Sequence, residues 1–270
     1  MSSMGRALAA IAATRSRRST AATVASVLAL SGLVSGCGPN KEEVCAKATE
    51  HVVLVPSTSV SDLGTSRALA PAVAKQAVAR SANTCGRLTV GLQNAKTEAD
   101  LELQSIDLVP ERKQAFNRTP VIRKLVRQGE TFASDKLLDP LGKVSATGGS
   151  PFVGALAKIA AELDAHGGAP ATVILLGDGI DVESTPGGDG MIDFRSTSVS
   201  QANLDEFVPL LKGLKGSCVM LIAAGAASNL PAERIRAGQR MLDQTLEKAG
   251  VGFVATRSRD LPATCRETAQ

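Results

Sequence analysis

Short apolar runs alternate along this chain with segments of helical periodicity, and this alternation restricts the fold more than any other feature of the sequence. The runs lie at residues 52–55, 172–176, 218–224 and 251–255. An uninterrupted apolar run is typical of a strand that is covered on both faces, as in a parallel sheet. We therefore expect an α/β fold, with a doubly wound, mostly parallel sheet and helices on both of its faces.

Helical patterns fill most of the intervals between these runs. Apolar residues recur at helical spacing over three long segments. These segments are residues 66–82, 152–163 and 231–249. A shorter helix is predicted at 203–211, where Asn203 and Glu206 have the spacing of a capping box.

Two regions carry less regular patterns. Residues 110–141 contain two helical patterns, which we expect to be interrupted at Gly129 and at Asp139-Pro140. Apolar and polar residues alternate over 88–92 and again over 101–106. This alternation predicts a hairpin at the edge of the sheet, and hence one antiparallel edge strand.

The N-terminus has the features of an export signal. Residues 1–20 contain four arginines and no acid, and residues 21–34 form an apolar stretch that is short for a membrane span. The following Val34-Ser35-Gly36-Cys37 resembles a bacterial lipobox, in which the cysteine becomes the lipid-carrying first residue of the mature protein. We therefore expect a membrane-anchored extracytoplasmic lipoprotein of the bacterial cell envelope.

The expected organisation follows from that signal. Residues 1–36 are predicted to be the signal peptide, residues 37–47 the lipidated cysteine and a short linker, and residues 48–270 one folded domain. The signal peptide holds four of the 30 basic residues, so the mature chain has 26 against 26 acids. With no net charge, no tryptophan and no tyrosine, a nucleic-acid partner is not expected.

The remaining cysteines form an even set outside the cytosol, which favours disulfides. They are Cys45, Cys85, Cys218 and Cys265. Three pairings are possible, and we favour Cys45 with Cys85 and Cys218 with Cys265, because each pair brackets strands expected to be neighbours. The alternative is four reduced, buried thiols. No C-x-x-C spacing supports a zinc site.

Three short polar pieces lie at or near the ends of predicted strands and helices. Ser57-Thr58-Ser59-Val60-Ser61 follows the first strand, Gly148-Gly149-Ser150-Pro151 precedes a helix, and Gly177-Asp178-Gly179 follows the 172–176 strand. The carboxyl ends of strands form the ligand-binding edge of open α/β sheets. Hydroxyl and carboxylate oxygens are ligands that hard dications prefer.

In this order, the pieces resemble the metal-ion-dependent adhesion site of the von Willebrand factor type A (vWA) domain, over roughly residues 48–257. The resemblance implies a Rossmann-like, vWA-like fold and a site for Mg²⁺, or alternatively Mn²⁺ or Ca²⁺. It further implies that an acidic side chain of a protein partner completes the metal shell. The implied metal ligands are Ser57, Ser59, Ser61, Ser150 and Asp178.

Ser57 stands where the family has an aspartate. The lost attraction to a dication about 4 Å away is about 8 kcal/mol gross at an effective dielectric of ~20, most of it offset by desolvation. We therefore expect metal binding to be weak or lost, unless Asp62 or Asp181 leans in to compensate. Thr147 contributes to the site if its loop is shifted. A purely structural alternative is a serine loop that caps the next helix, with Asp178 in an Asx turn.

The expected function is a protein-binding, adhesion or scaffold module, and not an enzyme. One alternative is a metal-independent envelope scaffold of the same fold. Another is a hydrolase or phosphate-transfer enzyme that uses Asp178 and acids at 181–193. These acids belong to the segment 181–200, which has no regular pattern and lies next to the site. His51 and His166, the two histidines of the chain, are expected at turns or strand starts away from the site.

Overall fold

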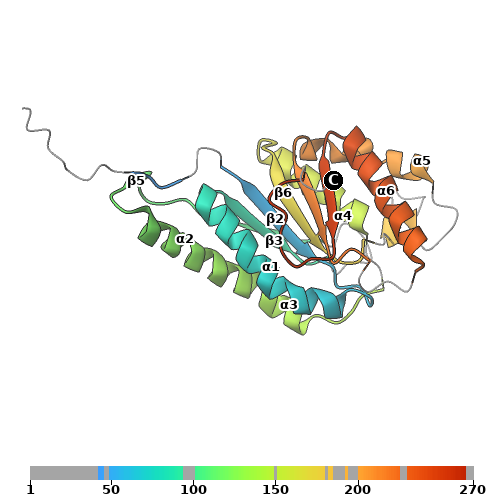
Figure 1. The fold of residues 1–270 in the computed structure, drawn as a ribbon, viewed down its shortest axis with the longest axis horizontal. Helices are drawn as coiled ribbons and strands as arrows, with labels where there is room; N and C mark the ends of the chain where they lie inside the picture. Colours follow the sequence, from blue (N-terminus) through green and yellow to red (C-terminus); the bar gives the residue numbers. More distant parts are fainter. Residues whose placement is uncertain are drawn as a thin grey trace, which may run out of the picture. The chain divides into compact units, whose positions relative to one another are not determined.

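A six-stranded sheet forms the centre of the computed structural model of this protein (Figure 1). The structure describes residues 42–45, 49–93, 101–148, 151–179, 182–184, 192–193, 200–225 and 230–265. The strands, in spatial order, are β10 (Gly252–Thr256), β9 (Cys218–Ile222), β6 (Ala171–Leu176), β2 (His51–Pro56), β3 (Arg87–Gly91) and β4 (Leu103–Asp107). All neighbours are parallel except β3 and β4, so the predicted antiparallel edge strand is confirmed.

Helices cover both faces of this sheet, as the alternating pattern predicted. The helical elements are α1 (Leu63–Thr84), α2 (Arg118–Ala133), the π-helix η2 (Ser134–Leu138), α3 (Asp139–Lys143), α4 (Phe152–Ala165), α5 (Gln201–Asp205), the 3-10 helix η3 (Val208–Leu214) and α6 (Ala232–Lys248). In Figure 1, α1 and α2 lie side by side along one face, and α4 and α6 lie on the other. The doubly wound α/β fold is therefore confirmed.

Two apolar layers hold the helices to the sheet. Odd-numbered residues of β2, such as Val53 and Val55, pack with α4, η3 and α6. The even-numbered Val52 and Leu54 face α1 and α2 on the other side. Because successive side chains of a strand point to opposite faces, a continuous apolar run is needed to fill both layers.

The segment after β4 differs from its prediction. Residues 118–143 form one helical run, α2–η2–α3, which neither Gly129 nor Pro140 interrupts. Pro140 lies in the first turn of α3, where its missing N–H is least costly. Gly129 faces α1, and a β-carbon at this position would lie 2.7 Å from Cγ1 of Val78. This glycine is therefore a close-packing position between two helices and not a break.

The predicted capping box is also displaced. In α5 it consists of Ser200 and Asn203, and not of Asn203 and Glu206. The Asn203 side chain accepts from the Ser200 N–H at 2.9 Å. Pro209 is the second residue of the separate 3-10 helix η3, so the expected single helix at 203–211 is two short elements.

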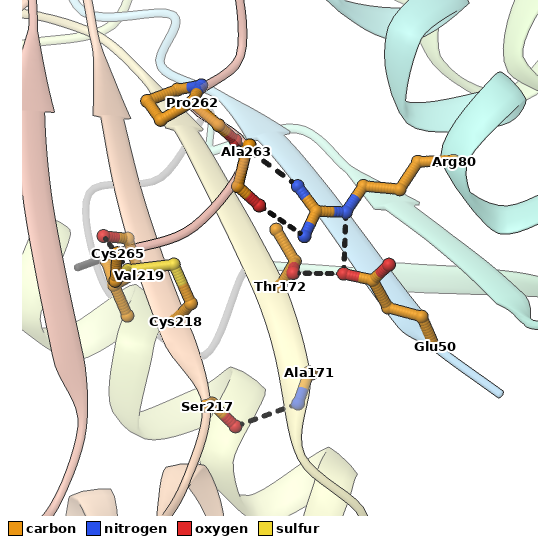
Figure 2. Close-up of a disulfide and its surroundings, with 10 residues drawn as sticks. All are labelled: Glu50, Arg80, Ala171, Thr172, Ser217, Cys218, Val219, Pro262, Ala263 and Cys265. Carbon is orange, nitrogen blue, oxygen red and sulfur yellow. Dashed lines mark hydrogen bonds and ion pairs between the residues drawn. A yellow bond between two sulfur atoms is a disulfide. The ribbon is translucent and has the colours of Figure 1, made fainter. Parts of the chain in front are cut away.

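Both predicted disulfides are present. Cys45–Cys85 joins the segment before β2 to the end of α1, and Cys218–Cys265 joins the start of β9 to the C-terminal segment. Figure 2 shows the second bridge beside Arg80 of α1. The Arg80 guanidinium donates to Glu50 Oε1 at 2.7 Å and to the carbonyls of Pro262 and Ala263. The segments around Cys45 and Cys265 are thus both held near the amino edge of the sheet.

Two short ladders lie outside the main sheet. β1 (Glu42–Glu43) pairs antiparallel with β5 (Gln114–Ala115). Within the 181–200 segment, β7 (Val182–Ser184) pairs antiparallel with β8 (Ile192–Asp193). Across the described ranges, none of the helices has the length and apolar content that a membrane crossing requires.

Candidate functional site

The carboxyl ends of three central strands bring two of the predicted pieces together. Ser57 follows β2, and its N–H donates to the carbonyl of Leu176 at the end of β6. The Gly177 N–H in turn donates to the carbonyl of Ile222 at the end of β9. The serine loop and Asp178 therefore lie at the same edge of the sheet, as the sequence predicted.

Ser59 is the centre of the hydroxyl cluster. Its Oγ lies 3.0 Å from Ser61 Oγ and donates to Asp62 Oδ2 at 2.9 Å. It also accepts from the backbone N–H of Asp62 at 3.2 Å. Ser57 Oγ accepts from the Ser59 N–H at 3.3 Å, which fixes the turn at the start of the loop. Ser57 and Ser59 are both buried.

Asp62 supplies an acidic group near the one that is missing at Ser57. Its side chain is fully buried, and Oδ1 accepts from the backbone N–H of Asp178 at 2.8 Å. Asp62 occupies the N-cap position of α1, yet its side chain does not cap the helix. It turns to the Asp178 loop instead, while the positive end of the α1 dipole stabilises the buried carboxylate.

The approach of Asp62 to the Asp178 loop depends on Gly177. A β-carbon at position 177 would lie 2.5 Å from Cζ of Phe152 and 3.0 Å from Asp62 Oδ2. Asp178 itself is 4% exposed. Two aspartates of adjacent loops are thus buried at one place, and burial of carboxylates favours an arrangement in which hydrogen bonds or a cation compensate them.

The loop that contains the Gly148-Gly149-Ser150-Pro151 piece contacts the serine loop through Thr147. The Thr147 N–H donates to the carbonyl of Thr58, and the Val60 N–H donates to the carbonyl of Thr147, both at 3.0 Å. This short parallel bridge places Gly148 next to the serine loop. Thr147 Oγ1 lies 3.4 Å from Thr58 Oγ1 and not within the Ser59 cluster. Ser150 and Asp181 lie outside the described residues.

Gln93 is a polar residue of this edge that the sequence did not indicate. It is the bridge partner of Ser57, and its carbonyl accepts from the Thr58 N–H at 3.0 Å. The side chain is 1% exposed, and neither Nε2 nor Oε1 has a hydrogen-bond partner within the described part of the chain. An unsatisfied buried amide costs about 1–3 kcal/mol per group, so this position favours a polar ligand. A glutamine after a predicted strand carries no pattern that could have singled it out.

The oxygen atoms of the cluster fit a small dication. Adjacent ligands of an octahedral Mg²⁺ at 2.0–2.1 Å are about 3 Å apart, which is the separation of Ser59 Oγ and Ser61 Oγ. Ser59 Oγ already donates to Asp62 Oδ2 and accepts from the Asp62 N–H, so a cation at this place would have to replace one of the hydrogen bonds of Ser59. No group of three His, Cys, Asp or Glu side chains that could hold a metal occurs in the described ranges. A metal here therefore depends on hydroxyl oxygens.

The histidines lie away from this cluster. His51 begins β2 at the amino edge, where Nε2 lies 2.7 Å from Thr89 Oγ1. Burial, and secondly the nearby Arg87 guanidinium, lowers the pKa of His51 from 6.5 to about 4. His166 follows α4, and its Nδ1 lies 2.8 Å from the carbonyl of Glu162. Neither histidine is within the serine cluster.

Comparisons with known proteins concern the fold. No protein-family model matches the chain, and no curated protein matches it by sequence. A von Willebrand factor type A protein from Catenulispora acidiphila aligns at 14% identity over 78% of this chain and 39% of its own, with a TM-score of 0.40. The PilB minor pilin from Streptococcus sanguinis aligns at 13% identity over 78% and 58%, with a TM-score of 0.43.

The SpaC pilus adhesin from Lactobacillus rhamnosus GG aligns at 13% identity over 79% of this chain and 28% of its own, with a TM-score of 0.40. This chain therefore spans between about a quarter and three fifths of these three structures. Because the TM-scores are below 0.5, we base the fold on the strand order, the antiparallel edge strand and the helices on both faces. On these features the chain has a vWA-like fold.

Proposed function

We propose that this protein is a lipid-anchored extracytoplasmic module that binds a protein partner through a divergent divalent-metal site at the carboxyl edge of its sheet. The observation that supports it most directly is the cluster of the buried Ser59 and Asp62 with the exposed Ser61, next to the buried Asp178. Ser59 and Ser61 are the proposed direct ligands, together with Ser150 and Asp178. Ser57 fixes the loop, and Asp62 orients Ser59.

A bound metal would add positive charge next to the two buried aspartates, Asp62 and Asp178, at the carboxyl edge of the sheet. A bound Mg²⁺ usually keeps several waters, and one of these positions can be filled by a carboxylate from outside. An acidic side chain of the partner is therefore the proposed ligand. The exposed Val60, between the two serines, lies where such a partner arrives, and its side chain is 74% exposed. The anchor is proposed to be lipid on Cys37, after removal of residues 1–36.

The first experiment is a calorimetric titration of Mg²⁺ and Mn²⁺ into metal-stripped, oxidised residues 38–270. We expect binding, and we expect Asp178→Asn and Asp62→Asn to weaken it at least tenfold. Asp107→Asn is the matched control, because Asp107 is an exposed aspartate at the amino edge that pairs with Arg87. Ser57→Asp is expected to tighten binding, because it adds a carboxylate beside the metal.

A second measurement tests the partner chemistry. With Mn²⁺ bound, acetate serves as the simplest carboxylate probe, and displacement of metal-bound water by acetate lowers the relaxation rate of bulk water protons. We expect this decrease in the wild type, and none in Asp178→Asn. Metal binding without any acetate effect would leave a cation site but contradict recognition of acidic side chains.

One observation favours a second function, a metal-independent scaffold of the same fold. Both carboxylate oxygens of Asp62 already accept hydrogen bonds, from Ser59 Oγ and from the Asp178 N–H. The cluster can therefore be stable without a cation. Absence of binding up to millimolar metal in both wild type and Ser57→Asp would support this scaffold. Turnover of an ester or phosphate substrate that is lost in Asp178→Ala would support the hydrolase alternative.

A further inference from the structure

The chain enters the domain at a point that is fixed by several contacts. β1 pairs with β5, and the Val44 N–H donates to the carbonyl of Lys113 at 2.9 Å. Arg118 Nε donates to the carbonyl of Val44 at 2.6 Å, and the adjacent Cys45 is bridged to Cys85. The segment just before the domain is therefore tied to the loop between β4 and α2, at the amino edge of the sheet.

This entry point limits how far the domain can lie from a lipid on Cys37. Four residues lie between Cys37 and Glu42, and the five steps from one Cα to the next span at most about 18 Å when fully extended. The inference rests on the lipid anchor of the proposed function. Given that anchor, the loop and the start of α2 lie close to the membrane surface.

The surface at this place is apolar. Val109 and Phe116 are 60% and 64% exposed, and within the described ranges the other large apolar residues with this degree of exposure are Val60 and Leu210. Between them lies a groove of about 440 Å³, with Pro110, Ala115, Pro120 and Val121 in its walls. Apolar side chains that are exposed together on a folded domain mark an interaction site.

The same surface is basic, although the mature chain has no net charge. Five of its side chains are exposed cations: Arg112, Lys113, Arg123, Lys124 and Arg127. The exposed acids on and beside these segments are Glu111, Glu130 and Glu43, which faces Gln114 in the β1–β5 ladder. Glu111 forms an ion pair with Lys124 at 2.6 Å. Each cation near an anionic bilayer adds to the electrostatic attraction between protein and membrane. Local charge and apolar exposure therefore favour the same partner.

We propose that this basic face, the residues 109–128 with Phe116 at its centre, docks on the anionic phospholipid surface to which the chain is tethered. Phe116 and Val109 enter the headgroup region, and the cations contact the lipid phosphates. Docking sets the orientation of the domain. The six residues of β2 span about 20 Å between the two edges of the sheet. Docking at the amino edge therefore directs the serine edge away from the membrane.

The test uses tryptophan reporters, because the chain has no tryptophan. Phe116→Trp places one on the basic face, and Val60→Trp places one at the opposite edge of the sheet. Each lipidated protein is purified from membranes and reconstituted in vesicles of phosphatidylglycerol and phosphatidylethanolamine that contain brominated lipid. We expect Trp emission at position 116 to shift to shorter wavelength and to be quenched, and Trp emission at position 60 to remain unchanged.

Charge reversal provides the second comparison. In the Phe116→Trp protein, Arg112→Glu, Lys113→Glu and Arg123→Glu together are expected to abolish the quenching. The matched control reverses three exposed cations of helices on the other side of the sheet: Lys158→Glu, Lys212→Glu and Arg240→Glu. It is expected to retain the quenching. Equal quenching in both triple variants would contradict recognition by charge.

The outcomes separate docking from anchoring. If the protein stays in the vesicle fraction through Cys37 but position 116 is no more quenched than position 60, docking is wrong and the anchor stands. If Cys37 carries no lipid, the anchor is wrong. The same reporters are then read with vesicles added to the soluble chain, and absence of quenching there overturns docking as well. A shift of the emission at position 116 to shorter wavelength without quenching by brominated lipid would indicate that a protein partner covers this position instead.

Discussion

At the serine edge, a buried carboxylate lies close to the position where the vWA resemblance calls for one. Ser57 lacks the carboxylate that the vWA resemblance calls for, and the buried Asp62 provides one five residues later. Asp62 reaches the Asp178 loop from the N-cap of α1. Gly177 leaves space for the Asp62 carboxylate. A motif aligned letter by letter does not reveal such a displacement, whereas the hydrogen bonds of the carboxylate do.

Gly129 gives a stability prediction at the residue scale. Gly129→Ala places a methyl group 2.7 Å from Cγ1 of Val78, and such overpacking typically costs about 1–3 kcal/mol. Gly142→Ala is the matched control, because nothing lies within 4 Å of its added carbon in α3. There the better helix propensity of alanine is expected to leave stability unchanged or to raise it by up to about 1 kcal/mol.

Urea unfolding of the two variants measures both effects. The prediction is contradicted if Gly129→Ala is as stable as the wild type, since α1 and α2 would then be able to separate without cost. A loss of stability in Gly142→Ala would mean that the α2–η2–α3 run is more constrained than its open surroundings indicate.

At the scale of elements, α1 holds the C-terminal segment against the sheet. Gln76 Nε2 donates to the carbonyl of Arg259, and Gln76 Oε1 accepts from the Leu261 N–H at 2.9 Å. Arg80 contacts the next carbonyls and Glu50, which also accepts from Thr172 Oγ1 at 2.5 Å (Figure 2). The segment between Thr256 and Cys265 therefore has its order from side chains of a helix and from one disulfide.

Arg80→Gln is predicted to loosen this segment without unfolding the domain. The Arg80–Glu50 pair is partly exposed, so we expect a loss of less than about 1 kcal/mol in global stability. The Leu261 amide is expected to exchange its hydrogen much faster, as mass spectrometry of the exchanged peptides can measure. The paired variant Cys218→Ser with Cys265→Ser is expected to cost more, about 2–4 kcal/mol.

The opposite ranking would contradict this description. Faster exchange at Leu261 only after loss of the disulfide, with no effect of Arg80→Gln, would mean that the bridge alone holds the segment. An equal global loss in both variants would place Arg80 among the residues on which the whole fold depends.

The elements differ in how well the sequence predicted them. Strands β2, β6, β9 and β10 were predictable because apolar runs with helices between them have one compact solution, although β10 lies at the edge of the sheet and is only half-buried. Gly129 was misread as a break, since sequence alone does not distinguish a helix stop from a close helix contact. The capping box of α5 was displaced because Ser200 and Asn203 fit the pattern better than Asn203 and Glu206, yet lie outside the apolar stripe. The β1–β5 ladder has no periodicity to detect.

At the scale of the whole molecule, His51 links stability to acidity. Its folded pKa is about 4, against 6.5 for the free side chain, mainly because of burial. The unfolded chain therefore binds more protons than the folded one between these values, so stability is lost as the pH falls from 6.5 towards 4. Above pH 6.5 this contribution is fully present.

His51→Gln is expected to reduce this acid sensitivity. The measurement is the urea midpoint of wild type and variant at pH 7 and at pH 4.5, with His166→Gln as a matched control, because His166 is a more exposed histidine. The wild type and the control are expected to lose more stability between the two values than His51→Gln. If the urea midpoint of all three proteins falls equally between pH 7 and pH 4.5, the acid sensitivity comes from the carboxylates and not from His51.

The candidate site was predictable in outline because strand ends in a parallel sheet meet at one edge. Ser57, Ser59, Ser61 and Asp178 could be placed there from the order of the elements alone. The sequence left open whether Asp62 or Asp181 approaches the site, since the direction of an N-cap side chain depends on its tertiary contacts. Gln93 was missed because its position next to Ser57 comes from pairing between β2 and β3.

The two ends of β2 have a mechanical consequence for a tethered protein. The serine loop begins directly after β2, and the Cys45–Cys85 bridge holds the chain at its other end. A partner that pulls on the serine edge therefore applies its force along this strand. The ladders to β3 and β6 lie across that direction on both sides, so their hydrogen bonds share the load in shear and do not open one after another. In the proposed arrangement, tension between a partner and the membrane would therefore load both ladders of β2 in shear.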